Sequence, residues 1–215
     1  MNKRITTLTL LAALLLGLFA LVPKLIGLRL PGNDEGFEPT QPIAYSHRLH
    51  AGELGVDCQY CHSGAKRSRY AGIPAAAVCM NCHRFISASR SAVRAEEMLA
   101  EEEGREPNRV VSPELAKLYT ALALGPDLLP DPALEPQPIE WIRIYSLPDF
   151  AVFDHRPHVY AGVACQNCHG PVETMERVRQ VRSLSMGWCV NCHRNPQEAG
   201  VAVGQASIDC SACHY

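Results

Sequence analysis

The chain contains 215 residues, with 20 basic and 22 acidic side chains, and its formal charge of −2 gives no electrostatic reason to expect binding to nucleic acid. Its length suits one or two domains. Ten cysteines are too sparse for a small disulfide scaffold, and five Phe and two Trp are a thin aromatic supply for a core. We therefore expect something other than side chains to fill part of the interior.

The first predicted element is an apolar helix over residues 5–22, which carry no charge and follow Lys3 and Arg4. A helix of that length extends about 27 Å, close to the roughly 30 Å hydrocarbon core of a bilayer. A cleaved signal peptide is the alternative, but its apolar region would be shorter and a small-x-small cleavage site should follow. The sequence favours a retained membrane anchor in residues 1–30, followed by a linker over residues 31–44.

All ten cysteines belong to five copies of one pattern, Cys-x-x-Cys-His. Two thiols at this spacing can each form a thioether to a haem vinyl group, and the adjacent His then binds the iron. A zinc half-site or a redox dithiol would not require that His every time, and five disulfides would leave the histidines unexplained. We therefore predict five covalently bound haem c groups and no disulfides. The attachment residues are Cys58, Cys61, Cys79, Cys82, Cys165, Cys168, Cys189, Cys192, Cys210 and Cys213, and the proximal ligands are His62, His83, His169, His193 and His214.

The four remaining histidines form two His-x-x-His pairs, each shortly before a haem motif: His47 with His50, and His155 with His158. A lone unassigned histidine is usually a surface or core residue. Here every spare histidine lies in the same repeated pattern, so we predict that all four are distal iron ligands.

Five irons with four distal histidines leave one centre with another ligand or an open position. Methionine is the usual second choice, and a His/Met pair raises the reduction potential. Met80 is constrained inside a haem motif, and Met98 lies on a charged segment. Met186 and Met175 lie in the half with three motifs and only two spare histidines, and we choose Met186, with Met175 as the reserve.

The order of motifs indicates an internal repeat, with a dihaem module over residues 45–88 and a trihaem module over residues 140–215. The fold class expected is a multihaem c-type cytochrome, mainly short α-helices and irregular structure around haems, with little β-structure and one N-terminal transmembrane helix.

A helical and proline-rich insertion over residues 89–139 separates the modules. A helix is predicted over residues 89–103 and ends at Gly104, and a second begins with Ser112 as N-cap and Pro113. Five prolines between residues 126 and 138 predict extended chain, and residues 139–145 resemble a short strand. The insertion is expected to contact a partner or to clasp the two modules.

The motifs also resemble a known family. The carrying residues are the His47 and Cys58 motifs, Gly72-Ile-Pro74, the Cys79 motif, Ser146-Leu-Pro-Asp149, the His155 and Cys165 motifs and Met186-Gly-Trp-Cys189 with its His193. They resemble the pentahaem cytochrome subunit of bacterial alternative complex III, and the modules are similar to class III multihaem cytochromes. The resemblance implies partners in one quinol:electron acceptor oxidoreductase: an iron–sulfur subunit, a quinol-oxidising integral membrane subunit and a monohaem cytochrome subunit. It also supports Met186 as the odd ligand.

The expected function is electron relay, without a catalytic residue or a small-molecule substrate of the chain's own. Haem c is attached outside the cytoplasmic membrane, so the chain should be a single-pass protein of the bacterial cytoplasmic membrane, with its N-terminus inside and its haem domain on the periplasmic side. Residues 5–22 would contact the lipid bilayer. Two alternatives stay open: a stand-alone membrane-anchored cytochrome, and a catalytic multihaem reductase with one open iron.

Overall fold

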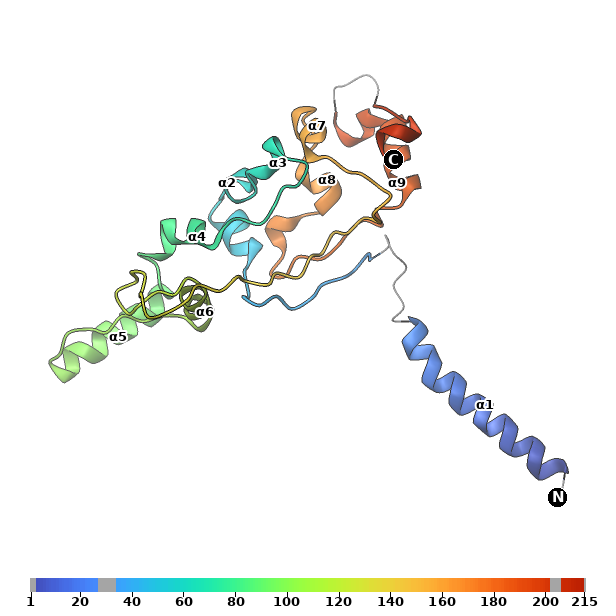
Figure 1. The fold of residues 1–215 in the computed structure, drawn as a ribbon. Coiled ribbons are helices and arrows are strands. Elements are labelled where there is room, and N and C mark those ends of the chain that lie inside the picture. Colours follow the sequence, from blue (N-terminus) through green and yellow to red (C-terminus); the bar gives the residue numbers. More distant parts are fainter. Residues whose placement is uncertain (1–2, 27–33, 202–205, 215) are drawn as a thin grey trace.

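The structure is a computed structural model that describes residues 3–26, 34–201 and 206–214. Among these residues no β-strand forms; the ordered elements are short helices joined by irregular chain (Figure 1). The helices are α1 (Lys3–Ile26), η1 (Arg48–Glu53), α2 (Cys58–Cys61), α3 (Gly64–Arg67), α4 (Ala76–His83), α5 (Arg90–Glu103), α6 (Pro113–Ala121), α7 (His155–Tyr160), α8 (Cys165–His169), η2 (Val172–Thr174), α9 (Met186–Arg194), η3 (Pro196–Ala199) and η4 (Cys210–Ala212).

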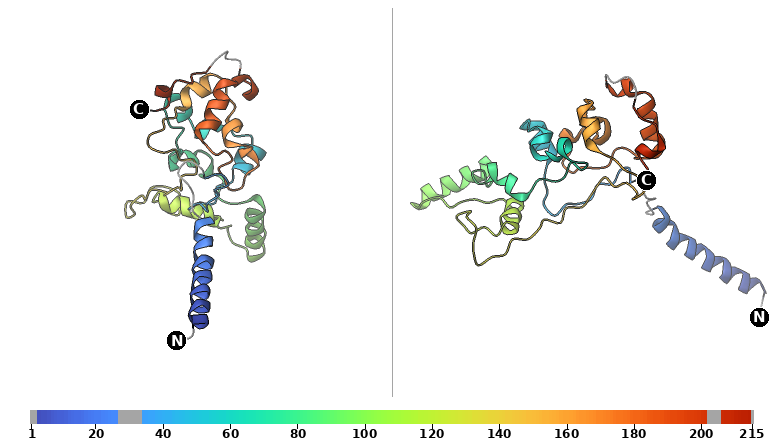
Figure 2. Two further views of the ribbon diagram at one scale, coloured as in Figure 1. Left: turned by 90° about the vertical axis from the view of Figure 1, so that its right-hand side faces the viewer. Right: turned by 45° about the horizontal axis from the view of Figure 1, so that its top comes forward.

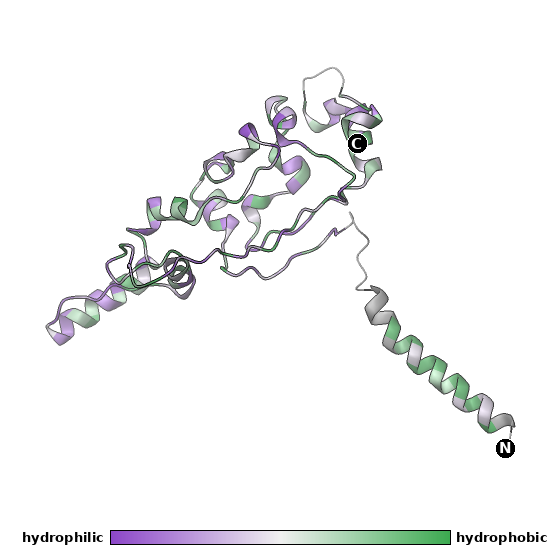
Figure 3. Ribbon diagram, in the orientation of Figure 1, coloured by the Kyte–Doolittle hydropathy of each residue, from purple (hydrophilic) through white to green (hydrophobic). Residues whose placement is uncertain are grey.

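The α1 helix is apolar through its middle and stands apart from the other helices (Figures 1 and 3). Its large side chains are exposed, including Leu8, Leu15 and Phe19. In the part of the chain that the structure describes, no helix combines the length and hydropathy that crossing a membrane requires.

The remaining helices form an elongated row, which two views show in the same order (Figures 1 and 2). The α5 and α6 helices lie at one end, α4, α2 and α8 follow, and α9 lies at the other end. Few apolar side chains are buried in the described residues; they are Ala65, Ala100, Leu118, Tyr119, Ala123, Met175 and Val201. This small core agrees with the thin aromatic supply of the sequence.

The two modules interlock reciprocally. The η1 helix of the first module packs on η2, which follows the third haem motif, and α7 of the second module packs on α3, which follows the first motif. Backbone hydrogen bonds hold both contacts, from Arg48 N to the Met175 carbonyl (2.9 Å) and from His155 N to the Arg69 carbonyl (3.2 Å). Each His-x-x-His segment is therefore positioned by the other module.

Three extended segments lie alongside one another: residues 34–44, 139–146 and 176–182. Residues 139–145 do not form the short strand that their composition predicts. No ladder partner lies beside them in the described chain; instead the Gln41 side chain both accepts from Ile142 N (2.8 Å) and donates to its carbonyl (2.9 Å). A side chain thus satisfies backbone groups that a neighbouring strand would otherwise bind. Residues 34–44, assigned to a linker from sequence, are bonded to both other segments through Gln41 and Gly36.

The insertion contains the two helices that the sequence predicts. The α5 helix begins after Ser89, whose hydroxyl accepts from Ala92 N, and ends at Gly104 with φ +65°. The α6 helix begins at Pro113 after the Ser112 cap. Its buried Tyr119 donates to the His83 carbonyl at 2.6 Å, so the insertion is attached to the second haem motif.

We expect the end of the insertion to loosen in acid. Hydrogen bonds from Arg105 and from Asn108 N lower the pKa of Glu96 from 4.5 to about 2. Because the folded pKa is depressed, the ionised carboxylate stabilises the folded insertion above about pH 4.5, and this stabilisation is lost as the pH falls toward 2. The protection of the amides of residues 90–110 against hydrogen exchange, relative to an unfolded chain at the same pH, should therefore fall across that window. Glu96→Gln should show fast exchange already at neutral pH, whereas Gln at the exposed neighbour Glu97 should not.

Candidate haem-binding centres

The five Cys-x-x-Cys-His motifs each occupy a short helix or a helix end. We number them in chain order: motif 1 (residues 58–62), motif 2 (79–83), motif 3 (165–169), motif 4 (189–193) and motif 5 (210–214). Side-chain N-caps start three of the helices because Asp57, Ser185 and Asp209 accept from backbone N–H groups of the first turn. All ten cysteines are exposed or half-buried, and hence accessible for covalent attachment.

The histidine rings are arranged as four facing pairs, each joining one spare histidine to one motif histidine. An imidazole nitrogen binds a transition metal at about 2 Å, so two imidazoles on opposite sides of one iron have ring centres about 6 Å apart. The observed pairs are His47 with His62 (6.4 Å between centres), His50 with His83 (6.1 Å), His155 with His169 (6.4 Å) and His158 with His193 (5.9 Å). The residues present therefore fit haem groups with two axial histidines at motifs 1 to 4.

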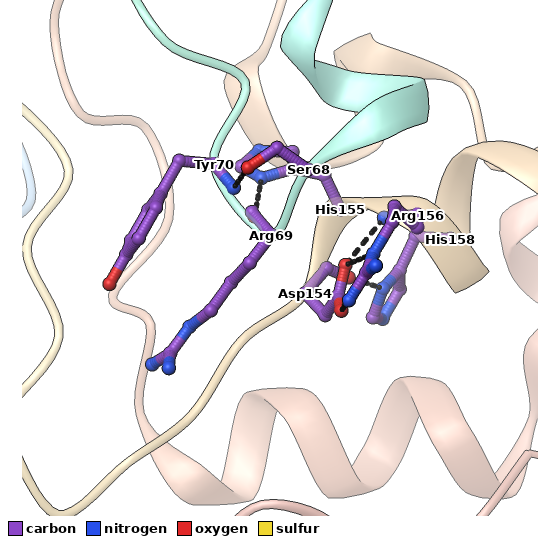
Figure 4. Close-up of polar contacts among 7 residues, drawn as sticks. All are labelled: Ser68, Arg69, Tyr70, Asp154, His155, Arg156 and His158. Carbon is purple, nitrogen blue, oxygen red and sulfur yellow. Dashed lines mark hydrogen bonds and ion pairs between the residues drawn. The ribbon is translucent and has the colours of Figure 1, made fainter.

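Backbone carbonyls fix the tautomer of most of these rings. When Nδ1 carries the proton and donates it to a carbonyl, Nε2 keeps its lone pair for iron. Such contacts, from 2.5 to 3.0 Å, involve His50, His62, His83, His155, His158, His193 and His214. The Arg69 carbonyl contacts the His155 ring and the Asp154 carbonyl contacts the His158 ring (Figure 4). The Nδ1 atom of His47 is buried without a partner in the described chain.

Burial keeps several of these imidazoles neutral. It lowers the pKa of His47 to about 4, with smaller contributions from His62 and His50, and lowers the pKa of His169 to about 4, with contributions from His155 and His62. Burial also lowers the pKa of His158. A neutral imidazole is the form that binds a metal, so these rings are in the form that could hold one at neutral pH.

Aromatic side chains that the sequence analysis did not single out contact the histidines. Tyr45 packs on His47 and His50, and Phe153 packs on His155 and His158. Tyr145 packs edge-on against His169. Tyr45 and Phe153 each stand two residues before a His-x-x-His pair, so an extended repeat pattern, aromatic-x-His-x-x-His, could have identified them.

Neighbouring cysteines place the motifs in a spatial order that differs from the chain order. Burial raises the pKa of five motif thiols, and a neighbouring thiol of another motif raises each of them further; the five are Cys58, Cys61, Cys79, Cys168 and Cys189. The neighbours join motif 2 to motif 1 (Cys79 and Cys82 with Cys61), motif 1 to motif 3 (Cys58 with Cys165), motif 3 to motif 4 (Cys168 with Cys192 and Cys189) and motif 4 to motif 5 (Cys189 with Cys213). The row therefore runs 2–1–3–4–5, and Figure 1 shows the helices of its first four motifs in the same order: α4, α2, α8 and α9.

Motif 5 has no partner histidine in the described chain. The nearest aromatic ring to His214 is that of Phe150, at 6.1 Å between centres, and the Phe150 carbonyl contacts His214 Nδ1. Met186, predicted as the fifth distal ligand, is the first residue of α9 and is 67% exposed, whereas the reserve, Met175, is buried. Neither methionine has a described contact with His214. No group of three or more His, Cys, Asp or Glu in the described residues could by itself hold a metal ion.

Two comparisons identify the kind of protein. Residues 151–215, which hold motifs 3 to 5, match the family described as cytochrome c7 and related cytochrome c. The chain is also similar to the multiheme cytochrome c subunit of menaquinone reductase from Nitratidesulfovibrio vulgaris, at 23% identity over 194 residues that cover 81% of this chain and 76% of that protein. The chain is a multihaem cytochrome c with covalently bound haem, and its C-terminal part is a cytochrome c7-like domain.

Proposed function

We propose that the chain carries five haem c groups and relays electrons along the row of motifs 2–1–3–4–5, as the cytochrome subunit of a quinol:electron acceptor oxidoreductase of the alternative complex III type. The observation that carries this proposal is the set of four histidine pairs, with ring centres 5.9 to 6.4 Å apart. Bound haem supplies one-electron redox chemistry. With both axial positions taken by histidine, such centres leave no iron site for a substrate at motifs 1 to 4.

The residues of the chain have distinct tasks in this relay. The motif cysteines would hold each haem in place, and the facing histidines would bind its iron. Backbone carbonyls accept the Nδ1 protons, which orients the rings and raises their basicity as ligands. Packing of η1 on η2 and of α7 on α3 brings the two modules together, and Cys58 of motif 1 then lies beside Cys165 of motif 3, so the row is continuous across them. We propose Met186 as the distal ligand of motif 5.

The proposed attachment to the membrane rests on the uncharged residues 5–22 and on the exposed leucines of α1. In this proposal the chain belongs to the bacterial cytoplasmic membrane with its haem domain on the periplasmic side. Its partners are an iron–sulfur subunit, a quinol-oxidising integral membrane subunit and a monohaem cytochrome subunit. The motif resemblance to alternative complex III supports this set, and similarity to a subunit of a quinone-converting complex supports its general kind.

The similarity to a menaquinone reductase subunit favours one second candidate, in which electrons flow along the same row toward a quinone. The residues that hold the haems would be the same in both directions. The two candidates differ in the potentials of the centres relative to the quinone pool, because electrons flow spontaneously toward the more positive couple.

The test is isolation of the full chain from its native membranes in a mild detergent. We expect a haem-to-chain ratio of five by the pyridine haemochrome assay, co-purification with iron–sulfur and polytopic subunits, and reduction of the bound haem by added quinol. A chain with Cys210 and Cys213 both replaced by Ser should bind four haems and remain in the complex.

Other outcomes would overturn particular parts of the proposal. Isolation as a solitary cytochrome would support the stand-alone alternative. A high-spin centre that binds cyanide rapidly would support a catalytic reductase. Haem that added quinol leaves oxidised, but that added quinone reoxidises after chemical reduction with dithionite, would reverse the direction of the relay.

A further inference from the structure

A single aromatic ring contacts both histidines in each His-x-x-His segment. Tyr45 lies edge-on to His47, at 4.8 Å and 81°, and stacks on His50, at 4.4 Å and 21°. In the second module Phe153 lies edge-on to His155, at 4.8 Å and 87°, and faces His158, at 4.5 Å and 32°. The first histidine of each segment thus contacts the aromatic ring edge-on, and the second contacts its face.

The paired rings differ in the same repeated way. The planes of His47 and His62 are 4° apart, and those of His155 and His169 are also 4° apart. The second histidine of each segment gives twisted pairs instead: 61° between His50 and His83, and 42° between His158 and His193. Motifs 1 and 3 therefore have parallel axial rings, and motifs 2 and 4 have rotated ones.

The hydrogen bonds of the His-x-x-His rings also differ between the first and the second histidine of each segment. His50 and His158 contact carbonyls four residues earlier in their own segments, those of Ser46 and Asp154. His155 instead contacts the Arg69 carbonyl of the other module, and His47 Nδ1 has no described partner. The two histidines of a segment therefore share no hydrogen-bond partner that could fix the orientation of both rings. The aromatic ring is the side chain that both rings share.

We propose that Tyr45 and Phe153 are positioning residues that give each module two different kinds of bis-histidine haem, one with parallel axial rings and one with rotated rings. This inference rests on the distal-ligand assignments of the proposed function. The consequence is electronic. Parallel imidazoles split the two iron d orbitals that interact with their π systems and give a rhombic low-spin signal. Rotated imidazoles leave these orbitals closer in energy and give a strongly anisotropic signal with a larger maximal g value.

The experiment is low-temperature EPR on the oxidised full chain in detergent, with haem content measured on the same sample. We expect two rhombic and two strongly anisotropic signals from motifs 1 to 4, with a separate signal from motif 5. Tyr45→Leu should shift or broaden one of the two rhombic signals, that of motif 1, and one of the two strongly anisotropic signals, that of motif 2. The signals of motifs 3 and 4 should stay unchanged. Phe153→Leu should have the complementary effect.

Conservative and matched variants separate positioning from folding. Tyr45→Phe and Phe153→Tyr keep the ring and should keep the unsubstituted spectrum. Tyr160→Leu removes an exposed aromatic side chain from the end of α7 and should also leave the spectrum unchanged. The spectrum of the unsubstituted chain tests the two classes directly, whatever the yield of the Leu variants.

Two results would overturn the inference. One is a single class of bis-histidine signal in the unsubstituted chain; the other is an unaltered spectrum in both Leu variants with full haem content. Either result with five haems bound would leave the proposed relay intact. A haem-to-chain ratio below five would instead contradict the proposed function.

Discussion

Replacing His47 by Met will raise the reduction potential of the centre at motif 1 by on the order of 0.1 V without lowering the haem content. A thioether donates less electron density than an imidazole, so the reduced iron is favoured. Both thioether attachments and the proximal His62 are untouched, and His62 keeps its hydrogen-bond contact with the Gly72 carbonyl at 2.6 Å. Because motif 1 is internal to the row 2–1–3–4–5, the change should trap an electron there and slow transfer between the modules.

A spectroelectrochemical titration of the full chain measures this effect. Leu49→Met is the matched control, since Leu49 lies between His47 and His50 and is 41% exposed. It adds the same side chain without replacing a ligand, and it should leave every potential unchanged. An unaltered titration curve for His47→Met would show that His47 is not an axial ligand.

Gly52→Ala will destabilise the contact between the modules. A Cβ at Gly52 would overlap the Glu173 carbonyl oxygen of η2, and the obstacle is backbone, which cannot rotate away as a flexible side chain could. Overpacking of this kind costs about 1–3 kcal/mol or more. The displaced η1 helix carries Arg48, whose backbone N–H donates to Met175 and whose side chain forms an ion pair with Glu176.

We expect the variant to unfold at a lower denaturant concentration and to lose the axial His47 and His50 signals together, because both residues are positioned by η1 or the turn that starts it. Gly17→Ala in α1 is the control, since a Cβ there meets no atom within 4 Å. Unchanged stability and spectra for Gly52→Ala would contradict the close packing of η1 on η2.

Local sequence patterns were sufficient to predict the structure wherever a few adjacent residues determine it. The Ser89 and Ser112 caps and the Gly104 end of α5 were predictable because N-cap side chains and a left-handed glycine act within one helical turn. The strand expected over residues 139–145 did not form, because a strand needs a partner ladder and strand composition does not supply one. There the Gln41 side chain took the place of the partner.

In the haem centres, too, the sequence predicts what lies within one segment but not which distant segment packs against it. The attachment cysteines and proximal histidines follow from Cys-x-x-Cys-His, since covalent attachment needs residues at that spacing in one chain segment. The partner of each distal histidine could not be predicted, because the facing rings come from different segments. His155 faces His169 fourteen residues on, but its ring and backbone are held by Arg69 of the other module.

The sequence by itself determined the class of cofactor and the helices of the insertion, and it predicted the attachment residues and the two His-x-x-His segments, because each depends on contacts within a few residues. Only the tertiary structure decided which histidines face each other, the row 2–1–3–4–5 and the alternation of parallel and rotated rings. These depend on the reciprocal packing of η1 on η2 and of α7 on α3. Such packing joins segments more than 80 residues apart, such as Arg69 and His155, whose separation along the chain is 86. No local pattern specifies the distance or angle between side chains so far apart in sequence.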